Sequence, residues 1–161
     1  MTETLFRDDA YLKEAEAAVL AVNERGGIVL DRTVFYAQGG GQPGDRGELV
    51  RADGAVTPIA TTVYDAADRK TIVHVPAEGA TLPAAGERVT VRLDWPTRYA
   101  RMRAHTALHL LSVALPYPVT GGQVGDGEGR LDFDIAEAGL DKDQIAAEVN
   151  AMVAKDAAVT F

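Results

Sequence analysis

The sequence contains no cysteine among its 161 residues. This excludes disulfide bridges and any zinc site built on thiolates within the chain. Long hydrophobic runs are also missing: apolar stretches such as Leu108–Leu111 are short, whereas a membrane helix needs about 20 apolar residues. The first residues lack the basic start and apolar core of a signal peptide. We therefore expect a cytoplasmic protein with no membrane partner.

Basic residues are few, with 16 Lys and Arg against 24 Asp and Glu and a net charge of −8. This balance counts against a nucleic-acid partner, because phosphate contacts supply much of the affinity for nucleic acids. A local basic patch is still compatible with such a partner. The densest candidate for one consists of Arg88, Arg92, Arg98, Arg101 and Arg103.

Short apolar segments separated by turns fill the first 93 residues. In the segment 89–93, apolar and polar residues alternate, which is the period-two pattern of a half-buried strand. Ala18–Val22 and Ile28–Leu30 flank a glycine-containing turn and predict a hairpin. A helical turn is expected near 8–13, and further strands at 34–36, 47–50, 56–63 and 72–75. Their near-regular spacing predicts a small barrel or sandwich.

The pattern changes at Trp95-Pro96, where proline suits the start of a helix. Residues 97–115 contain no glycine or proline, so one helix is expected there. A strand pair within 120–134 follows. The segment Asp141–Gln144 resembles a capping box before an amphipathic helix on which Ile145, Val149, Met152 and Val153 share a face. Residues 159–161 look like the start of another strand. The prediction is an α+β chain with a β-barrel-like domain at 1–93 and an α/β domain at 94–161.

Two of the three histidines, His105 and His109, lie four residues apart in the expected helix. This spacing puts both imidazoles on one helical face, where one tetrahedral metal ion can accept a nitrogen from each. The alternative is a pair of partly buried histidines with local hydrogen bonds. The third, His74, is flanked by valines and is expected to be an ordinary strand residue. Nothing in their spacing recommends the later carboxylates as ligands: Asp126, Asp132 and Asp134.

Two glycine-rich segments are further candidates for a site. In 39–45, successive glycines let backbone amides approach a ligand and tolerate positive φ; the alternative is a wide hairpin loop. Its spacing is wrong for a dinucleotide fingerprint, and the Lys-Ser/Thr of a P-loop is missing. In 120–123, the Thr120 hydroxyl and the Gln123 amide can recognise a small polar ligand; the alternative is a glycine turn entering a hairpin.

Together these segments resemble the editing region of alanyl-tRNA synthetase and the free-standing AlaX proteins. Residues 28–49, IVLDRTVFYAQGGGQPGDRGEL, look like the glycine-rich segment of that family. Residues 101–111, RMRAHTALHLL, look like its first zinc motif, His-x-x-x-His, and 120–134 resemble the strand pair that follows. The order matches, and the resemblance covers nearly the whole chain. The glycine-rich domain indicates the medium-length AlaX type.

The resemblance implies a zinc-dependent, ATP-independent hydrolase that deacylates tRNA(Ala) mischarged with serine or glycine, with the 3′ adenosine in a cleft. It implies His105 and His109 as metal ligands and Thr120 and Gln123 as catalytic residues. The substrate-binding residues it implies are Gly39, Gly40, Gly41, Gln42 and Asp45. The family's second zinc motif, Cys-x-x-x-His, is absent here. We therefore expect 94–161 to be a partial editing domain, from a truncated or cleaved chain or a short homologue, and to be inactive alone.

Two other functions fit the same residues. The first is a non-catalytic module that binds tRNA or aminoacyl-tRNA through a degenerate metal site, which the acidic charge and the missing ligands favour. The second is a metal-dependent hydrolase of small esters or amides unrelated to RNA. Stoichiometric zinc argues against the first, and strictly RNA-dependent activity argues against the second.

Overall fold

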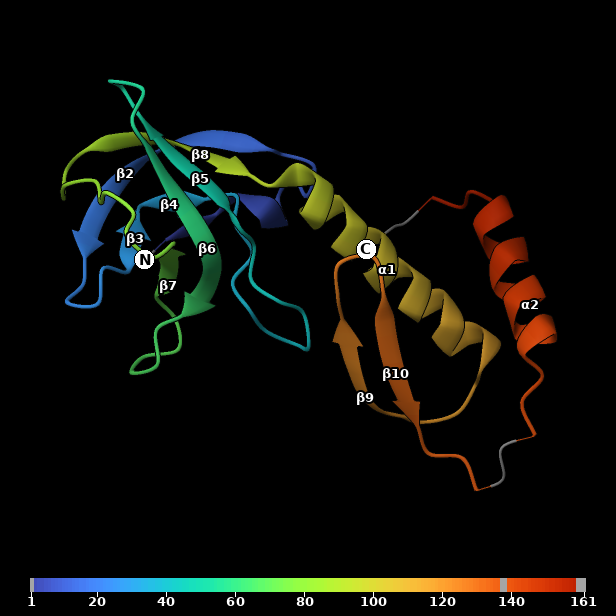
Figure 1. Ribbon diagram of the computed structural model, residues 1–161. Helices are drawn as coiled ribbons and strands as arrows, with labels where there is room; N and C mark the ends of the chain where they lie inside the picture. The colour runs from blue at the N-terminus through green and yellow to red at the C-terminus, as the bar shows by residue number, and fades with distance from the viewer. Residues whose placement is uncertain (1, 137–138, 159–161) are drawn as a thin grey trace. The chain divides into compact units, whose positions relative to one another are not determined.

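The computed structural model describes residues 2–136 and 139–158. The chain divides into two compact units, Met1–Arg98 and Tyr99–Phe161, the first rich in strands and the second carrying helices and a hairpin (Figure 1). That these units are independent domains with a boundary near residue 94 stays a prediction. The strand expected at 159–161 lies outside the described residues. No helix in the described part is long and apolar enough to cross a membrane.

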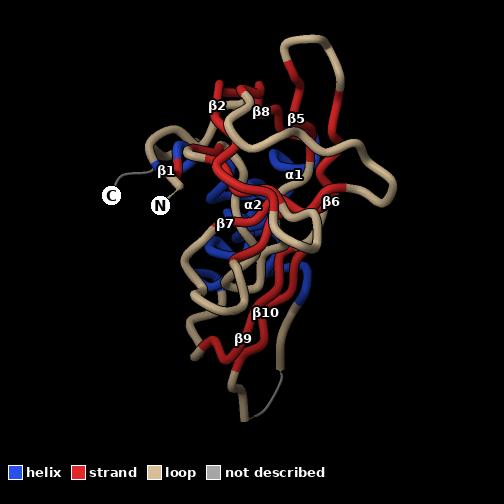
Figure 2. Tube along the Cα trace, turned by 90° about the vertical axis from the view of Figure 1, so that its left-hand side faces the viewer, coloured by secondary structure: helices blue, strands red, loops and turns tan. Residues whose placement is uncertain are grey.

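The first unit is built on a closed antiparallel barrel of six strands. Going around the barrel, the strand order is β2-β3-β7-β6-β5-β8, and the β5–β6 hairpin extends beyond the barrel in both views (Figures 1 and 2). The elements are β1 (Glu3–Thr4), the 3₁₀ turn η1 (Leu5–Arg7), β2 (Glu14–Val22), β3 (Ile28–Leu30), β4 (Arg32–Thr33), β5 (Gly47–Arg51), β6 (Val56–Tyr64), β7 (Ile72–Pro76) and β8 (Arg88–Leu93). The α+β class and the barrel are confirmed.

Alternation along the strands explains why the barrel closes around an apolar core. In β8, Val89, Val91 and Leu93 are buried and the residues between them are not, because successive side chains leave opposite faces of a strand. The same period applies to Ala17 and Val19 of β2, which pairs with β8. The core cluster consists of Ala17, Val19, Ile28, Leu30, Val34, Phe35, Leu49, Ile59, Val89, Val91 and Leu93.

Two local predictions for this unit were wrong. The segment 34–36 is not a strand, although Val34 and Phe35 are completely buried. Its backbone amides donate to side-chain oxygens and not to a neighbouring strand. Phe35 N donates to Thr33 Oγ1 at 3.0 Å, and Tyr36 N donates to Asp45 Oδ2 at 2.7 Å. The helical turn expected at 8–13 lies at η1, where Leu5 packs against the core.

His74 is a fully buried residue of β7, as the sequence predicts. Its Nδ1 lies 3.1 Å from the carbonyl oxygen of Ile28, and its Nε2 lies 2.8 Å from Thr33 Oγ1. Because a carbonyl only accepts, Nδ1 carries the proton, and the Thr33 hydroxyl donates to Nε2. Burial lowers the pKa of His74 to about 4, and the hydrogen bond to Ile28 opposes this shift only in part. The imidazole is therefore neutral within the core at ordinary pH.

Helix α1 (Trp95–Ala114) begins in the first unit and continues into the second. The prediction of a helix starting at Trp95-Pro96 is confirmed. Asp94 caps it, since its carboxylate accepts from the backbone N and the hydroxyl of Thr97, and such a side chain satisfies amides that lack a partner in the first turn.

The second unit continues with the antiparallel hairpin β9 (Val119–Val124) and β10 (Gly129–Phe133) and with α2 (Lys142–Ala154). Asp141 is the N-cap of α2 and accepts from the backbone N of Asp143 and Gln144, which confirms the predicted start. Ile145, Val149 and Met152 are half-buried, but Val153 is 59% exposed.

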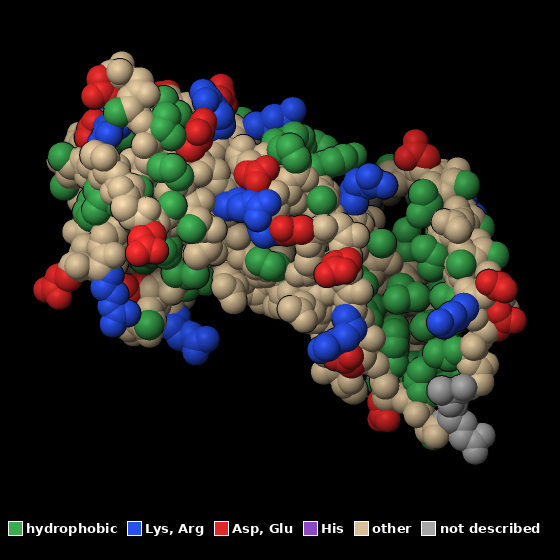
Figure 3. Space-filling view, viewed as in Figure 1, with side chains coloured by type: hydrophobic (Ala, Val, Ile, Leu, Met, Phe, Trp, Pro, Cys, Tyr) green, Lys and Arg blue, Asp and Glu red, His purple; other side chains and the backbone are tan. Residues whose placement is uncertain are grey.

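Between α1, α2 and the β9–β10 turn lies an apolar groove of about 450 Å³. Figure 3 shows hydrophobic side chains gathered along it. Its apolar lining comes from Ala104, Ala107, Leu108, Leu111, Ile145, Ala146 and Val149. Since α2 has no fully buried residue, this helix packs only along one partly covered stripe.

Candidate functional site

The histidine pair lies on one face of α1, as the four-residue spacing predicts. The rings of His105 and His109 are stacked, with centroids 5.0 Å apart and an interplanar angle of 15°, and both residues are exposed. The pKa of His105 lies below its usual value, first because of desolvation and then because of the neighbouring His109. Both effects favour the neutral imidazole, which is the form that binds a metal ion.

The donor set of this pair fits half of a zinc site. Structural and catalytic zinc ions take three or four protein ligands. Within 2–136 and 139–158, no group of three or more His, Cys, Asp or Glu side chains is placed to hold a metal ion. Two of the carboxylates considered from the sequence form ion pairs with arginines, Asp126 with Arg101 and Asp132 with Arg130.

The glycine-rich segment forms a tight turn whose tip is exposed. Gly39 and Gln42 exchange both backbone hydrogen bonds, at 3.2 and 3.0 Å. Gly40 and Gly41 have φ of 56° and 78°, the combination that a two-residue type I′ turn requires and that glycine adopts without steric cost. Both are exposed, whereas Gln42 is buried. The run of glycines is therefore explained first by the turn, and its exposed tip leaves backbone accessible to a ligand.

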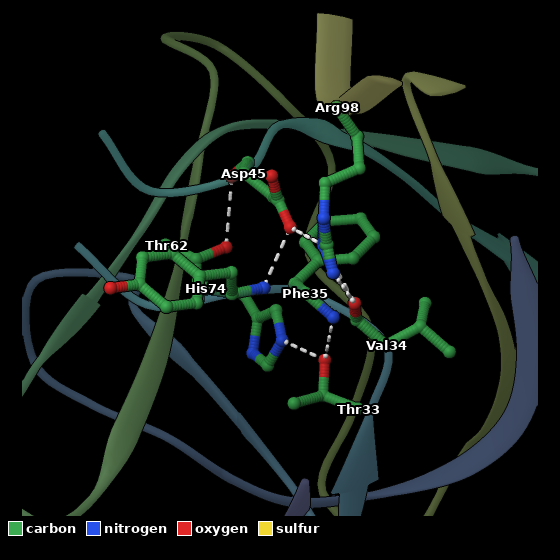
Figure 4. Close-up of polar contacts among 8 residues, drawn as sticks. Thr33, Val34, Phe35, Asp45, Thr62, His74 and Arg98 are labelled. Atoms are coloured by element: carbon green, nitrogen blue, oxygen red, sulfur yellow. Dashed lines mark hydrogen bonds and ion pairs between the residues drawn. The ribbon is translucent and has the colours of Figure 1, made fainter. Parts of the chain in front are cut away.

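The end of the same loop is held by close backbone approach and by charge. A Cβ on Gly44 would lie 1.8 Å from the carbonyl oxygen of Thr62, so only glycine fits there. Asp45 is buried and forms an ion pair with Arg98, as Figure 4 shows. Substrate binding by this loop stays a prediction, and the carboxylate of Asp45 faces the interior of the unit, where it binds the guanidinium.

Thr120 and Gln123 both lie on β9, but in different surroundings. The Thr120 hydroxyl donates to the carbonyl oxygen of Asp132 across the hairpin at 3.2 Å. Gln123 pairs with Arg130, and both line a hollow of about 280 Å³ together with Glu128.

The register of the hairpin gives Gln123 a definite face. Gly129 faces α1, since a Cβ on it would lie 2.8 Å from Leu108. The next pair along the strands is Gln123 with Arg130, and neighbouring pairs alternate between faces. Gln123 therefore leaves the sheet on the side away from α1. A catalytic role for Thr120 and Gln123 stays a prediction.

Three arginines of the candidate basic patch are paired with carboxylates. Arg98 and Arg101 are buried and paired with Asp45 and Asp126. Arg92 pairs with two carboxylates on neighbouring strands, Glu14 at 3.0 Å and Glu48 at 2.9 Å. Partners distant in the chain thus neutralise three of the five arginines. Sequence reasoning missed the buried pair because no spacing signal connects Asp45 with a residue 53 positions away.

Comparison with known proteins adds to this geometry. Residues 5–97 match the family of class II (A) tRNA synthetases. The alanyl-tRNA editing protein AlaX-M of Methanosarcina acetivorans is 40% identical over 151 residues, which cover 88% of this chain and 60% of the relative. AlaX-L of Pyrococcus horikoshii is 37% identical over 118 residues, covering 71% and 28%. The alanine–tRNA ligase of Pyrobaculum calidifontis is 43% identical over 110 residues, covering 68% and 12%.

The chain therefore belongs to the family of class II (A) tRNA synthetases. The resemblance to alanyl-tRNA editing proteins of the AlaX type is confirmed by these relatives. The chain spans about 60% of the length of the AlaX-M relatives from Methanosarcina acetivorans and Methanosarcina mazei.

Proposed function

We propose that this chain acts in alanyl-tRNA editing, as part of a cytoplasmic hydrolase that removes serine or glycine from mischarged tRNA(Ala). The observation that carries the proposal is the His105–His109 pair on a helix, preceded in the sequence by a tight glycine turn, in a chain similar to proteins named alanyl-tRNA editing proteins. In this proposal editing occurs in trans: the mischarged tRNA leaves the synthetase and then binds the editing protein.

The reaction is hydrolysis of the ester between the amino acid and the 3′ adenosine. Water adds to the ester carbonyl, the bond to the ribose oxygen breaks, and the products are the free amino acid and tRNA. Hydrolysis of this ester has a favourable free energy, so the reaction needs no ATP. In the complete site, His105 and His109 would hold zinc, and a bound zinc ion would supply a polarised water or an anchor for the substrate. Desolvation and the neighbouring His109 lower the pKa of His105 and so favour the neutral form that this role needs.

The glycine turn leaves its backbone open to a ligand. No side-chain atom projects from Gly40 and Gly41, and a Cβ on Gly40 would meet nothing within 4 Å. A ligand can therefore approach the backbone of this exposed tip closely. We infer that the tip, with Gly39 and Gln42 at its base, contacts the aminoacylated end of the tRNA.

Selectivity follows from the hydroxyl that serine has and alanine lacks. A site built to hydrogen-bond a hydroxyl discriminates strongly against an analogue that leaves its polar groups unpaired. We assign this recognition to Thr120 and Gln123, whose hydroxyl and amide are the polar side chains of β9. A synthetic pocket for alanine rejects the smaller glycine poorly and serine only modestly, which is why a second site is needed.

The second candidate is a module that binds aminoacyl-tRNA without catalysis. The observation that favours it is that, among the described residues, no third His, Cys, Asp or Glu side chain joins His105 and His109 in a group that could hold a metal ion. This second function predicts that zinc does not change the affinity for RNA and that no amino acid is released.

The test is release of labelled serine from Ser-tRNA(Ala) and of labelled alanine from Ala-tRNA(Ala). We expect the full native open reading frame containing this chain to hydrolyse only the first, and the 161-residue chain alone to be nearly inactive. His105→Ala should abolish serine release. Thr106→Ala, at an exposed position of the same helix, is the matched control and should retain it. Equal rates for His105→Ala and wild type, or equal hydrolysis of both substrates, would refute the proposal.

A further inference from the structure

A buried ion pair joins the end of the glycine-rich loop to the first turn of α1. Asp45 is 1% exposed and Arg98 is 4% exposed. Both belong to the first unit. Figure 4 shows the guanidinium of Arg98 beside the Asp45 carboxylate and the backbone of Val34.

The guanidinium bridges the two ends of the loop. One nitrogen, Nη1, donates to Asp45 Oδ2, and the other, Nη2, donates to the carbonyl oxygen of Val34 at 3.3 Å. Asp45 Oδ2 also accepts from the backbone N of Tyr36 at 2.7 Å. The chain entering the loop and the chain leaving it are thus bound to the same pair of charges. Planar, forked donation of this kind is specific to arginine.

Neutral hydrogen bonds complete the base of the loop. Asp45 N donates to the carbonyl oxygen of Tyr36 at 2.9 Å, and Gln38 N donates to that of Thr62 at 2.9 Å. The Thr62 hydroxyl donates to the carbonyl oxygen of Asp45 at 3.0 Å. The base is therefore fixed on both sides of the loop, while the tip at Gly40 is exposed and has open space around it.

Such a pair contributes little to stability as a unit. The cost of desolvating two charges offsets most of their attraction, and apolar replacement of a whole buried pair is often neutral or stabilising. Removing one partner alone is costly because it leaves a buried charge. The barrel core of aliphatic side chains already holds the unit together. The pair instead restricts the loop to one conformation.

We propose that Asp45 and Arg98 are positioning residues that hold the glycine-rich loop in the conformation that binds the aminoacylated end of the tRNA. We call the Asp45–Arg98 ion pair, with its hydrogen bonds to Val34 and Tyr36, the clamp. That the clamp fixes the loop rests on the geometry alone. That the loop binds the tRNA rests on the proposed function. Neither side chain is catalytic, since both are buried and bound to each other.

The test of the clamp compares the wild type with Arg98→Met and with the double variant Asp45→Asn/Arg98→Met. Hydrogen exchange is followed at the amides of Gly39 and Gln42. In the single variant we expect a lower melting temperature. In the double variant we expect the melting temperature to return close to that of wild type, but the two loop amides to exchange at least about tenfold faster, because a charge-assisted anchor is lost. Arg92→Met, which removes the two surface ion pairs with Glu14 and Glu48, should leave both readouts unchanged.

Two outcomes overturn the clamp. Loop amides that exchange in the double variant as slowly as in wild type show that other contacts fix the loop. A double variant that fails to fold shows that the pair serves stability.

A second readout separates the clamp from the proposed function. On Ser-tRNA(Ala), the double variant of the full native protein should show KM raised in inverse proportion to the fraction of molecules whose loop keeps the binding conformation, with a smaller change in kcat. If the loop is loosened and KM and kcat are both unchanged, the clamp stands and the use of the loop in the proposed function is wrong.

Discussion

Acidification is expected to destabilise the barrel through His74. This residue is completely buried, and its pKa is about 4, against an ordinary value of 6.5. Protons therefore bind the unfolded chain more readily than the folded one. The stabilising effect of neutral His74 is complete above the unfolded pKa of 6.5 and is lost as pH falls from 6.5 towards 4.

The size of the effect follows from the two pKa values. The separation between 6.5 and about 4 corresponds to about 3 kcal/mol of unfolding free energy when the loss is complete. At about pH 5, where the unfolded imidazole is charged and the folded one is mostly neutral, the loss is about 2 kcal/mol. The main cause is burial, which penalises the charged imidazolium. Protonation of Nε2 would also place a new N–H against the Thr33 hydroxyl, which now donates to it.

The assay is urea unfolding at about pH 7 and about pH 5, followed by the fluorescence of Trp95, the single tryptophan, which packs against the barrel core. His74→Asn should be less stable at neutral pH but should lose about 2 kcal/mol less than wild type on acidification. His109→Asn, at an exposed histidine, is the matched control and should keep the wild-type pH dependence. Equal losses for wild type and His74→Asn would refute the reasoning.

Gly44→Ala should cost about 3 kcal/mol of unfolding free energy, because its Cβ would lie 1.8 Å from the carbonyl oxygen of Thr62 and the backbone must shift; an unchanged midpoint in urea would contradict the close approach. Asp141→Ala should lower the helical circular dichroism signal and cost about 1 kcal/mol as the N-cap is lost, whereas Asp141→Asn should retain the signal. Zinc added to the 161-residue chain should be lost on dialysis, since His105 and His109 supply only two ligands; tight, stoichiometric zinc measured by mass spectrometry would show that further ligands exist.

Much of the barrel was predictable because its causes are local. Alternating apolar residues in 89–93 require a strand with one buried face, whatever its neighbours are. The change at Trp95-Pro96 likewise predicts a helix from the conformational limits of proline. A histidine between two valines, His74, is expected in a core strand. The four-residue spacing of His105 and His109 is enough to bring their rings together, since the helix itself sets that geometry.

Tertiary structure decided the features that depend on residues far apart in the chain. Val34 and Phe35 look like a strand but lie in a loop, because Thr33 and Asp45 supply acceptors that replace a ladder. Asp45 looks like a ligand-binding carboxylate of a glycine-rich segment, yet the path of the chain buries it against Arg98. Periodicity reports which face of an element is apolar, but it carries no information about which charge meets which across the fold. That choice is made only when the barrel closes, because desolvation then forces each buried charge to have a partner.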